Sequence, residues 1–103
     1  MIKHKPVIGV ATSTTPMPNT EFFACTTGTR AIKSLVEFSD CIPLQIPSIV
    51  DTNDCEELIN RVDGVMLTGG RANIEPHHFG GKPFPDDETI DPDRDKVVLS
   101  IIP

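Results

Sequence analysis

The chain of 103 residues carries nine Lys and Arg against fifteen Asp and Glu, which gives a formal net charge of -6 at pH 7. Its length suits one small domain over residues 1–103, and its 38% hydrophobic and 23% charged residues exclude a disordered or fibrous chain. Because the acidic balance repels phosphate backbones and anionic lipid, we expect no nucleic-acid partner and no membrane partner.

The first predicted element is a strand over residues 6–12 (PVIGVAT), whose apolar, β-branched run is typical of a parallel strand covered on both faces. The same run is too short for a signal-peptide core or a membrane span, so we expect a cytoplasmic protein. Residues 13–20 (STTPMPNT) predict a loop, since two prolines and several hydroxyl side chains interrupt any periodicity.

A helix is predicted over residues 27–39, where the apolar positions fall mostly on one side. Those positions are Ala31, Ile32, Leu35, Val36 and Phe38. Phe22 and Phe23 before them fit either the first turn of the helix or the preceding loop. Residues 41–46 (CIPLQI) predict a second strand, which lies nearer a sheet edge because Pro43 lacks the amide that a central ladder uses.

A second helix is predicted over residues 51–62, with capping residues and acidic side chains near its start that suit the helix dipole. Its apolar side consists of Cys55, Leu58, Ile59 and Val62. Residues 64–67 (GVML) predict a third strand, and the glycine pairs and prolines of residues 68–90 predict a long surface loop. Loops of that length are typically functional or disordered.

A last helix is predicted to begin with Asp91 as its N-cap and Pro92 at its first helical position. Its apolar side consists of Val97, Val98, Ile101 and Ile102. The alternation of strands and helices predicts βαβ units and a doubly wound α/β sheet. Three parallel strands would leave a face or edge of that sheet open. We therefore expect the chain to self-associate through its exposed strand or its truncated last helix, or to fold poorly.

The three cysteines, Cys25, Cys41 and Cys55, are widely spaced and form no CxxC or Cys/His cluster. This pattern indicates neither a disulfide framework nor a zinc site, and it favours buried structural thiols. None of the three stands on a sharp strand-to-helix turn beside a base, so no nucleophile is predicted among these residues.

Two further groups of polar residues could hold a cation. His77 and His78 are adjacent, and on an extended chain their side chains would point opposite ways, with no carboxylate or Cys at ligand spacing. We therefore predict no metal site. The acidic residues between positions 86 and 95 lack the EF-hand pattern and are interpreted as a solvated face.

The Gly69-Gly70 pair follows the third strand at its carboxyl end, which is where parallel α/β sheets bind ligands. Glycines there can present backbone amides to an anion or to the oxygen of a tetrahedral intermediate. They can equally supply the positive φ of a sharp turn, and the residues alone leave both interpretations open. The pair matches neither GxGxxG nor a Walker A loop.

Several motifs, taken in order, resemble the amino-terminal half of a class I glutamine amidotransferase-like hydrolase of the peptidase C26 or gamma-glutamyl-gamma-aminobutyrate hydrolase type. These are KPVIGVATS, IPLQIPSI, DGVMLTGGRANIEPHHFGGKP and DPDRD. The most specific part is the order LTGG, then Pro76, Phe79-Gly80 and Pro83, then Asp91-Pro92 and Arg94-Asp95. The resemblance covers essentially all 103 residues. It implies a flavodoxin-like three-layer α/β sandwich with a parallel sheet, present here only as its amino-terminal portion.

The resemblance also implies an activity. Members of this family cleave a gamma-glutamyl amide with a Cys-His-Glu triad through a thioester, without a cofactor. The glycines after LT supply an oxyanion-hole amide, which assigns that role to Gly69 or Gly70, with Gly70 preferred. Arg71 and Asn73 become candidate contacts of a small gamma-glutamyl amide substrate. The family's nucleophile, His and Glu lie further along than residue 103, so we expect this chain alone to be inactive.

This chain departs from many relatives at Ala72-Asn73-Ile74, where they carry an Asp-Val pair after the glycines, so its substrate preference stays open. An alternative function is that of a noncatalytic α/β module, which would bind a small anion at the glycine turn or dock a partner chain on its open edge. The absence of a nucleophile elbow favours this alternative for the 103 residues, and the order of the motifs favours the hydrolase.

Overall fold

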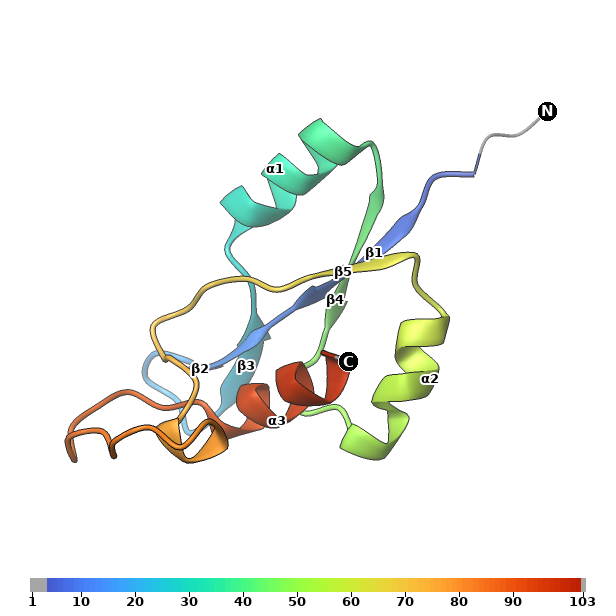
Figure 1. The fold of residues 1–103 in the computed structure, drawn as a ribbon. Coiled ribbons are helices and arrows are strands. Elements are labelled where there is room, and N and C mark those ends of the chain that lie inside the picture. Colours follow the sequence, from blue (N-terminus) through green and yellow to red (C-terminus); the bar gives the residue numbers. More distant parts are fainter. Residues whose placement is uncertain (1–3, 103) are drawn as a thin grey trace.

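The structure is a computed structural model that describes residues 4–102, so the ends of the predicted domain, residues 1–3 and Pro103, lie outside it. Its centre is a parallel sheet of β1 (Val7–Ala11), β4 (Ile42–Ile46) and β5 (Gly64–Met66) in the order β4-β1-β5 (Figure 1). The fold is therefore α/β with a parallel three-stranded sheet, as predicted.

The helices separate into two groups around this sheet. Figure 1 shows α1 (Thr29–Ser39) on one side of it, and α2 (Cys55–Asn60) with α3 (Pro92–Ile101) on the other. The connection from β1 through α1 leads to its parallel neighbour β4. The connection from β4 through α2 leads to β5 on the far side of β1, and both fit the predicted βαβ pattern. No helix in residues 4–102 is both long enough and apolar enough to cross a bilayer.

The edge position predicted for the second strand is confirmed. β4 pairs only with β1, in a register that sets Pro43 opposite Ile8. On the other side of β1, β5 is paired from Gly64 opposite Ile8 to Met66 opposite Val10, and it forms the second edge of the sheet. β1 is thus the central strand, and its carboxyl end lies between the carboxyl ends of both neighbours.

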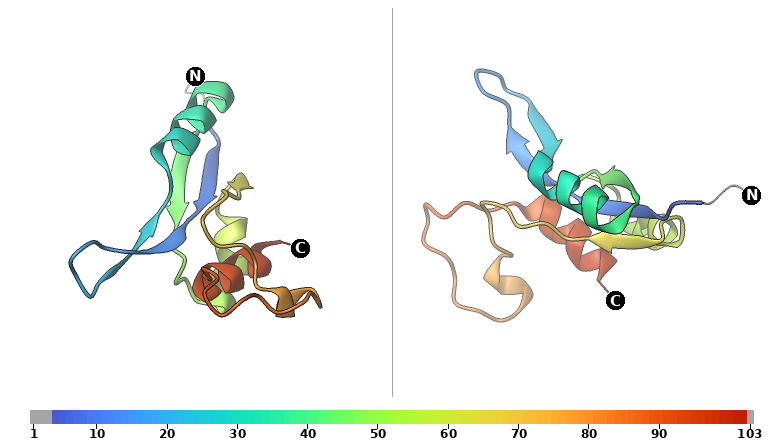
Figure 2. Two further views of the ribbon diagram at one scale, coloured as in Figure 1. Left: turned by 90° about the vertical axis from the view of Figure 1, so that its left-hand side faces the viewer. Right: turned by 90° about the horizontal axis from the view of Figure 1, so that it is seen from above.

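The loop predicted over residues 13–20 is partly wrong. Its first part is β2 (Ser13–Pro16), which pairs antiparallel with β3 (Phe23–Thr26). The hydroxyl oxygens of Thr15 and Thr26 lie 2.6 Å apart across this hairpin, so cross-strand pairing outweighs the interruptions by proline. Figure 2 shows the hairpin projecting away from the parallel sheet. Phe23 therefore belongs to a strand and not to the following helix.

The helix predicted over residues 27–39 is present as α1, but its packing is loose. No residue of α1 is buried, and Phe38, which was assigned to the apolar side, is 82% exposed. The helix ends at Asp40, which has a φ of 44° and donates its backbone N–H to the Val36 carbonyl. A left-handed C-cap of this kind normally favours glycine, so α1 ends at some conformational cost.

The densest core lies between the sheet, α2 and α3, and it is formed by Ile46, Cys55, Val97 and Ile101. The helix predicted over residues 51–62 is split, because a 3₁₀ turn, η1 (Thr52–Asp54), precedes α2. Cys41 and Cys55 are buried free thiols, as predicted, whereas Cys25 is half-buried. Burial raises the pKa of the Cys55 thiol, and the nearby carboxylates of Asp54 and Asp51 raise it further, which keeps the thiol protonated.

The start of the last helix is confirmed, and one interpretation of its acidic residues is wrong. The side chain of Asp91 accepts a hydrogen bond from the Arg94 amide, and Pro92 follows it as predicted. Asp91 and Asp95, however, are buried rather than part of a solvated face. Arg94 is buried beside them, so the first turn of α3 carries charged groups into the interior.

Candidate functional site

A cleft of about 860 Å³ opens at the carboxyl ends of β1 and β5. One wall is the β2–β3 hairpin, and the other is the β5–α3 loop, residues 67–91. Seven of its lining residues carry hydroxyl groups, namely Ser13, Thr14, Thr15, Thr26, Thr27, Thr68 and Thr89. This is the end of the sheet where ligands were expected, and its polar lining can hydrogen-bond a polar substrate.

Gly69 and Gly70 both line this cleft, and the structure separates their roles. A Cβ on Gly70 would lie 3.0 Å from Ser13 Oγ and 3.1 Å from Arg94 Nη1, whereas a Cβ on Gly69 would meet nothing within 4 Å. Among the described glycines, only Gly80 has a positive φ. The sharp-turn interpretation is therefore wrong for the pair, and Gly70 is explained by the close approach of its neighbours.

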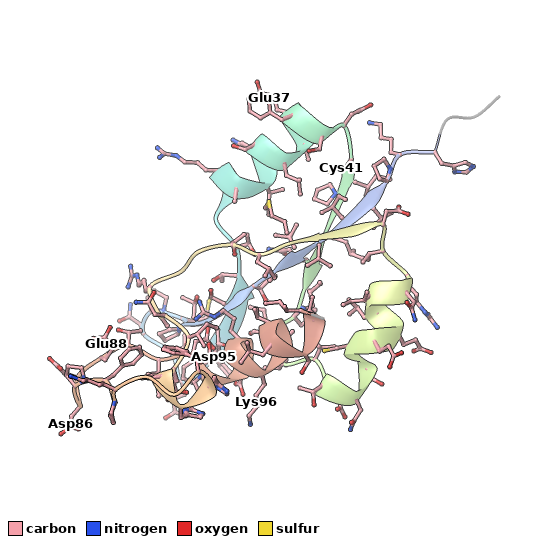
Figure 3. The ribbon with its side chains drawn as sticks, in the orientation of Figure 1. Glu37, Cys41, Asp86, Glu88, Asp95 and Lys96 are labelled. Atoms are coloured by element: carbon pink, nitrogen blue, oxygen red, sulfur yellow. The ribbon has the colours of Figure 1, made fainter. Side chains whose placement is uncertain are left out.

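Two buried charges brace the loop that follows Gly70. Arg94 donates from Nη2 to the Ala72 carbonyl at 2.7 Å and to Asp95 Oδ1 at 3.2 Å. The other oxygen of Asp95 accepts the Glu75 amide at 3.0 Å. Figure 3 shows Asp95 at the start of α3, close to this part of the loop. The ion pair thus fixes the backbone immediately after the glycines from the side of α3.

Asp91 connects the opposite wall of the cleft to the same helix. Its Oδ2 accepts the Thr14 amide at 2.7 Å, and its Oδ1 accepts the Arg94 amide at 3.1 Å. The Thr14 hydroxyl lies 2.8 Å from that of the buried Ser48, which in turn donates to Cys25 Sγ. The hairpin wall is therefore held by polar contacts to α3 and to the segment after β4.

The sequence predictions did not identify these supporting residues as part of a site. The sequence indicates Asp91 as a helix cap, Asp91 and Asp95 as part of a solvated acidic face, and all three of Asp91, Arg94 and Asp95 as part of a motif order. It predicts a loop at Ser13 and Thr14. The only sequence signal for these residues was the motif DPDRD after LTGG. The buried ion pair leaves no apolar periodicity in the sequence from which its burial could be predicted.

The two candidate substrate contacts face different spaces. Arg71 lines the large cleft. Asn73 instead lines a smaller pocket of about 260 Å³ on the other side of the glycine pair, together with Leu67, Arg94 and Val98. Gly69 and Gly70 border both spaces, so the glycine backbone is the partition between them. Both Arg71 and Asn73 are exposed and available to a ligand.

No cysteine of the described chain lines either of these two spaces. The cysteines therefore do not face the glycine backbone, in agreement with the prediction that they are structural. Cys25, on β3, directly precedes the cleft-lining Thr26, and its sulfur accepts the hydrogen bond of Ser48. A thiol with that partner and no adjacent base has no activation as a nucleophile.

The two histidines lie together, contrary to the geometry that the sequence suggested. Residues 76–78 form a 3₁₀ turn, η2 (Pro76–His78), instead of an extended chain. The rings of His77 and His78 are 4.0 Å apart between centroids, and a carboxylate, that of Glu75, lies beside them. The premise used to exclude a metal site at this position is therefore wrong.

Comparison with known proteins gives consistent matches. A family model described as Peptidase C26 matches residues 6–103. Gamma-glutamyl-gamma-aminobutyrate hydrolase of Escherichia coli O157:H7 is 29% identical over 62 residues. Gamma-glutamyl-gamma-aminobutyrate hydrolase PuuD of Escherichia coli strain K12 and the enzyme of the same description from Shigella sonnei strain Ss046 are 31% identical over 62 residues. Each alignment covers 59% of this chain and 24% of the relative, so the chain matches only part of these proteins.

Proposed function

The chain belongs to the peptidase C26 family, and from this membership we propose that it forms the amino-terminal part of a hydrolase that cleaves gamma-glutamyl amide bonds. The observation that carries the proposal is the position of Gly70. Its backbone stands at the carboxyl end of the sheet, between a hydroxyl-lined cleft and a second pocket, where a side chain would crowd Ser13 and Arg94.

In the proposed reaction, a cysteine thiolate adds to the side-chain carbonyl carbon of the gamma-glutamyl group. The Gly70 amide, with Gly69 as its neighbour, donates to the oxyanion that forms on that carbonyl. Collapse of the intermediate breaks the C–N bond, and the leaving amine takes a proton from a histidine. Water, deprotonated by the same histidine, then hydrolyses the thioester and releases glutamate and the thiol.

The proposal places the cysteine in polypeptide outside these 103 residues. Two features of the chain support this placement. An apolar groove of about 400 Å³ runs beside the open edge of β5, lined by Ile59, Val65, Leu67 and Ile101. The smaller pocket at Asn73 adjoins this groove, since Leu67 borders both. A further parallel strand in the groove would complete a flavodoxin-like three-layer sandwich and deliver its carboxyl end to Gly70.

Arg71 and Asn73 are proposed to bind the substrate from the two sides of the glycine partition. The Arg71 guanidinium suits the α-carboxylate of a glutamyl group, because it can form two parallel hydrogen bonds to it. Asn73, whose side chain can both donate and accept hydrogen bonds, suits the gamma-glutamyl amide group that the nucleophile attacks. The protein is expected to need no cofactor for this chemistry, to bind no nucleic acid and to reside in the cytoplasm.

Comparing two lengths of the protein tests the proposal. The verified 103-residue chain should release no glutamate from gamma-glutamyl-gamma-aminobutyrate, because an oxyanion donor without a nucleophile has no covalent intermediate to stabilise. A chain extended from the genomic sequence to the length of the relatives should turn the substrate over. Turnover by the 103-residue chain would contradict the placement of the nucleophile. An inactive extended chain that folds and binds a small anion would favour the noncatalytic module.

The 103-residue chain is also expected to self-associate through the β5 edge and its apolar groove. In sedimentation velocity, the weight-average sedimentation coefficient should increase with protein concentration. Leu67→Lys places a charge in the groove and should shift the protein toward monomer. Phe38→Lys, at an exposed position on α1 away from the groove, is the matched control and should leave the distribution unchanged. A stable monomer at all concentrations would contradict this expectation.

A further inference from the structure

The η2 turn gathers three metal-ligating side chains outside the cleft. Glu75, His77 and His78 each offer one donor atom, and these atoms all lie within 4.8 Å of one another. The turn that carries them is fixed by backbone hydrogen bonds, from the His78 amide to the Glu75 carbonyl at 3.1 Å and from the Gly81 amide to the Pro76 carbonyl at 2.9 Å. Pro76 itself is buried. The three donors are therefore presented from one anchored turn.

A buried carboxylate stands behind one of the imidazoles. Nε2 of His78 lies 4.0 Å from Oδ2 of Asp95, whose side chain is fully buried. The same Asp95 oxygen accepts the Glu75 amide. Histidines that bind metals commonly direct their second ring nitrogen at a carboxylate, which orients the ring and increases its basicity. At 4.0 Å these two atoms are beyond hydrogen-bond distance, and a small rotation of the ring would complete that contact and leave Nδ1 of His78 for a ligand.

The space beside the cluster also favours a cation. A pocket of about 310 Å³ is lined by Glu75 and His77 together with Asp86 and Glu88, from the outer limb of the β5–α3 loop. Among the described residues, no Lys or Arg lines it. Figure 3 shows Asp86 and Glu88 at the far end of the loop from Asp95. The cluster thus lies between a buried carboxylate and an exposed acidic limb.

We propose that Glu75, His77 and His78 bind a divalent transition-metal ion of the zinc type. Two imidazole nitrogens and one carboxylate oxygen suit Zn²⁺ and its neighbours rather than Mg²⁺ or Ca²⁺, which select oxygen ligands. Bonds of about 2.0–2.2 Å require the donors to close to about 3–3.5 Å from one another. His77 and His78 belong to exposed residues, so side-chain rotation provides this closure.

Metal binding at this turn would stabilise the loop that follows the glycine pair. Glu75 is both a proposed ligand and, through its amide, a partner of Asp95. Asp95 is paired with Arg94, which holds the Ala72 carbonyl. The ion would therefore act on the same segment that Arg94 and Asp95 brace, and its role is structural, separate from the proposed hydrolysis.

Isothermal titration of the 103-residue chain with Zn²⁺, under a phosphine reductant, tests the proposal without any activity assay. We expect one ion per chain. His77→Ala and His78→Ala should each weaken binding by at least about tenfold, since each removes a ligand. His4→Ala is the matched control, because it removes the remaining histidine at an exposed position outside the cluster. Glu75→Gln tests the carboxylate ligand and should also weaken binding.

A second probe separates this site from the cysteines. Co²⁺ bound at the cluster should show visible ligand-field bands without a thiolate-to-cobalt charge-transfer band in the near ultraviolet. Circular dichroism of each variant establishes that it remains folded. Absence of binding to the folded chain, an equal loss in His4→Ala, or a thiolate band would each overturn the proposal. None of these outcomes depends on whether the extended protein hydrolyses an amide.

Discussion

Replacement of Asp95 with Ala is expected to lower the free energy of unfolding by about 3–5 kcal/mol. The change leaves the buried Arg94 guanidinium without its carboxylate and removes the acceptor of the Glu75 amide. An uncompensated charge in the interior is among the most costly changes a small domain can undergo. Urea unfolding followed by circular dichroism gives the value, provided the transition is two-state.

The control for this variant is Asp93→Ala, in the same turn of α3. Asp93 is exposed, so its loss removes only a favourable interaction with the helix dipole, about 0.3–1 kcal/mol. The difference between the two variants isolates the buried pair from the general effect of removing an acidic residue near a helix start. Equal losses in both variants would contradict a bracing role for Asp95.

Gly70→Ala is expected to reduce kcat of the extended protein by about tenfold to a hundredfold, part of the roughly 10²–10³ that loss of an oxyanion donor costs. The new Cβ would stand 3.0 Å from Ser13 Oγ and 3.1 Å from Arg94 Nη1, so the backbone or its neighbours must shift. Because the displaced amide acts on the oxyanion and not on the bound substrate, KM should change little.

Gly69→Ala provides a matched control one residue away. Its Cβ would meet no atom within 4 Å, so the same chemical change should leave kcat near that of the unmodified protein. Steady-state kinetics of both variants on gamma-glutamyl-gamma-aminobutyrate decide between the two glycines. A loss confined to Gly69→Ala would assign the oxyanion amide to Gly69, and full activity in both variants would remove the pair from the mechanism.

The elements that the sequence predicted well are those with local signatures. β1 and β5 are short apolar runs, Pro43 indicated an edge strand, and Asp91-Pro92 marked a helix start, and all four features are present. The β2–β3 hairpin was missed because its pairing depends on threonines from two separate segments, such as Thr15 and Thr26. Proline and hydroxyl residues within one segment carry no information about such a partner.

The site was predictable in location but not in detail. The rule that ligands meet the carboxyl ends of parallel strands placed Gly69 and Gly70 correctly at a cleft. What distinguishes Gly70 is its proximity to Ser13 and Arg94, which come from opposite ends of the chain. The burial of Asp95 likewise depends on partners in a distant loop. Whether a charged residue is buried depends on partners that are distant in the sequence, so a single sequence does not reveal it.

The two oxygens of Asp91 have a consequence for motion in this protein. One oxygen accepts the Thr14 amide of the hairpin, and the other accepts the Arg94 amide in the first turn of α3. A single carboxylate therefore links the hairpin to the helix. Swinging the hairpin away to admit a ligand would break the Asp91–Thr14 hydrogen bond and with it the link from the helix start to that wall. Opening of the cleft thereby costs one of the two contacts of the Asp91 carboxylate, and a ligand that closes the hairpin favours the arrangement in which both contacts are made.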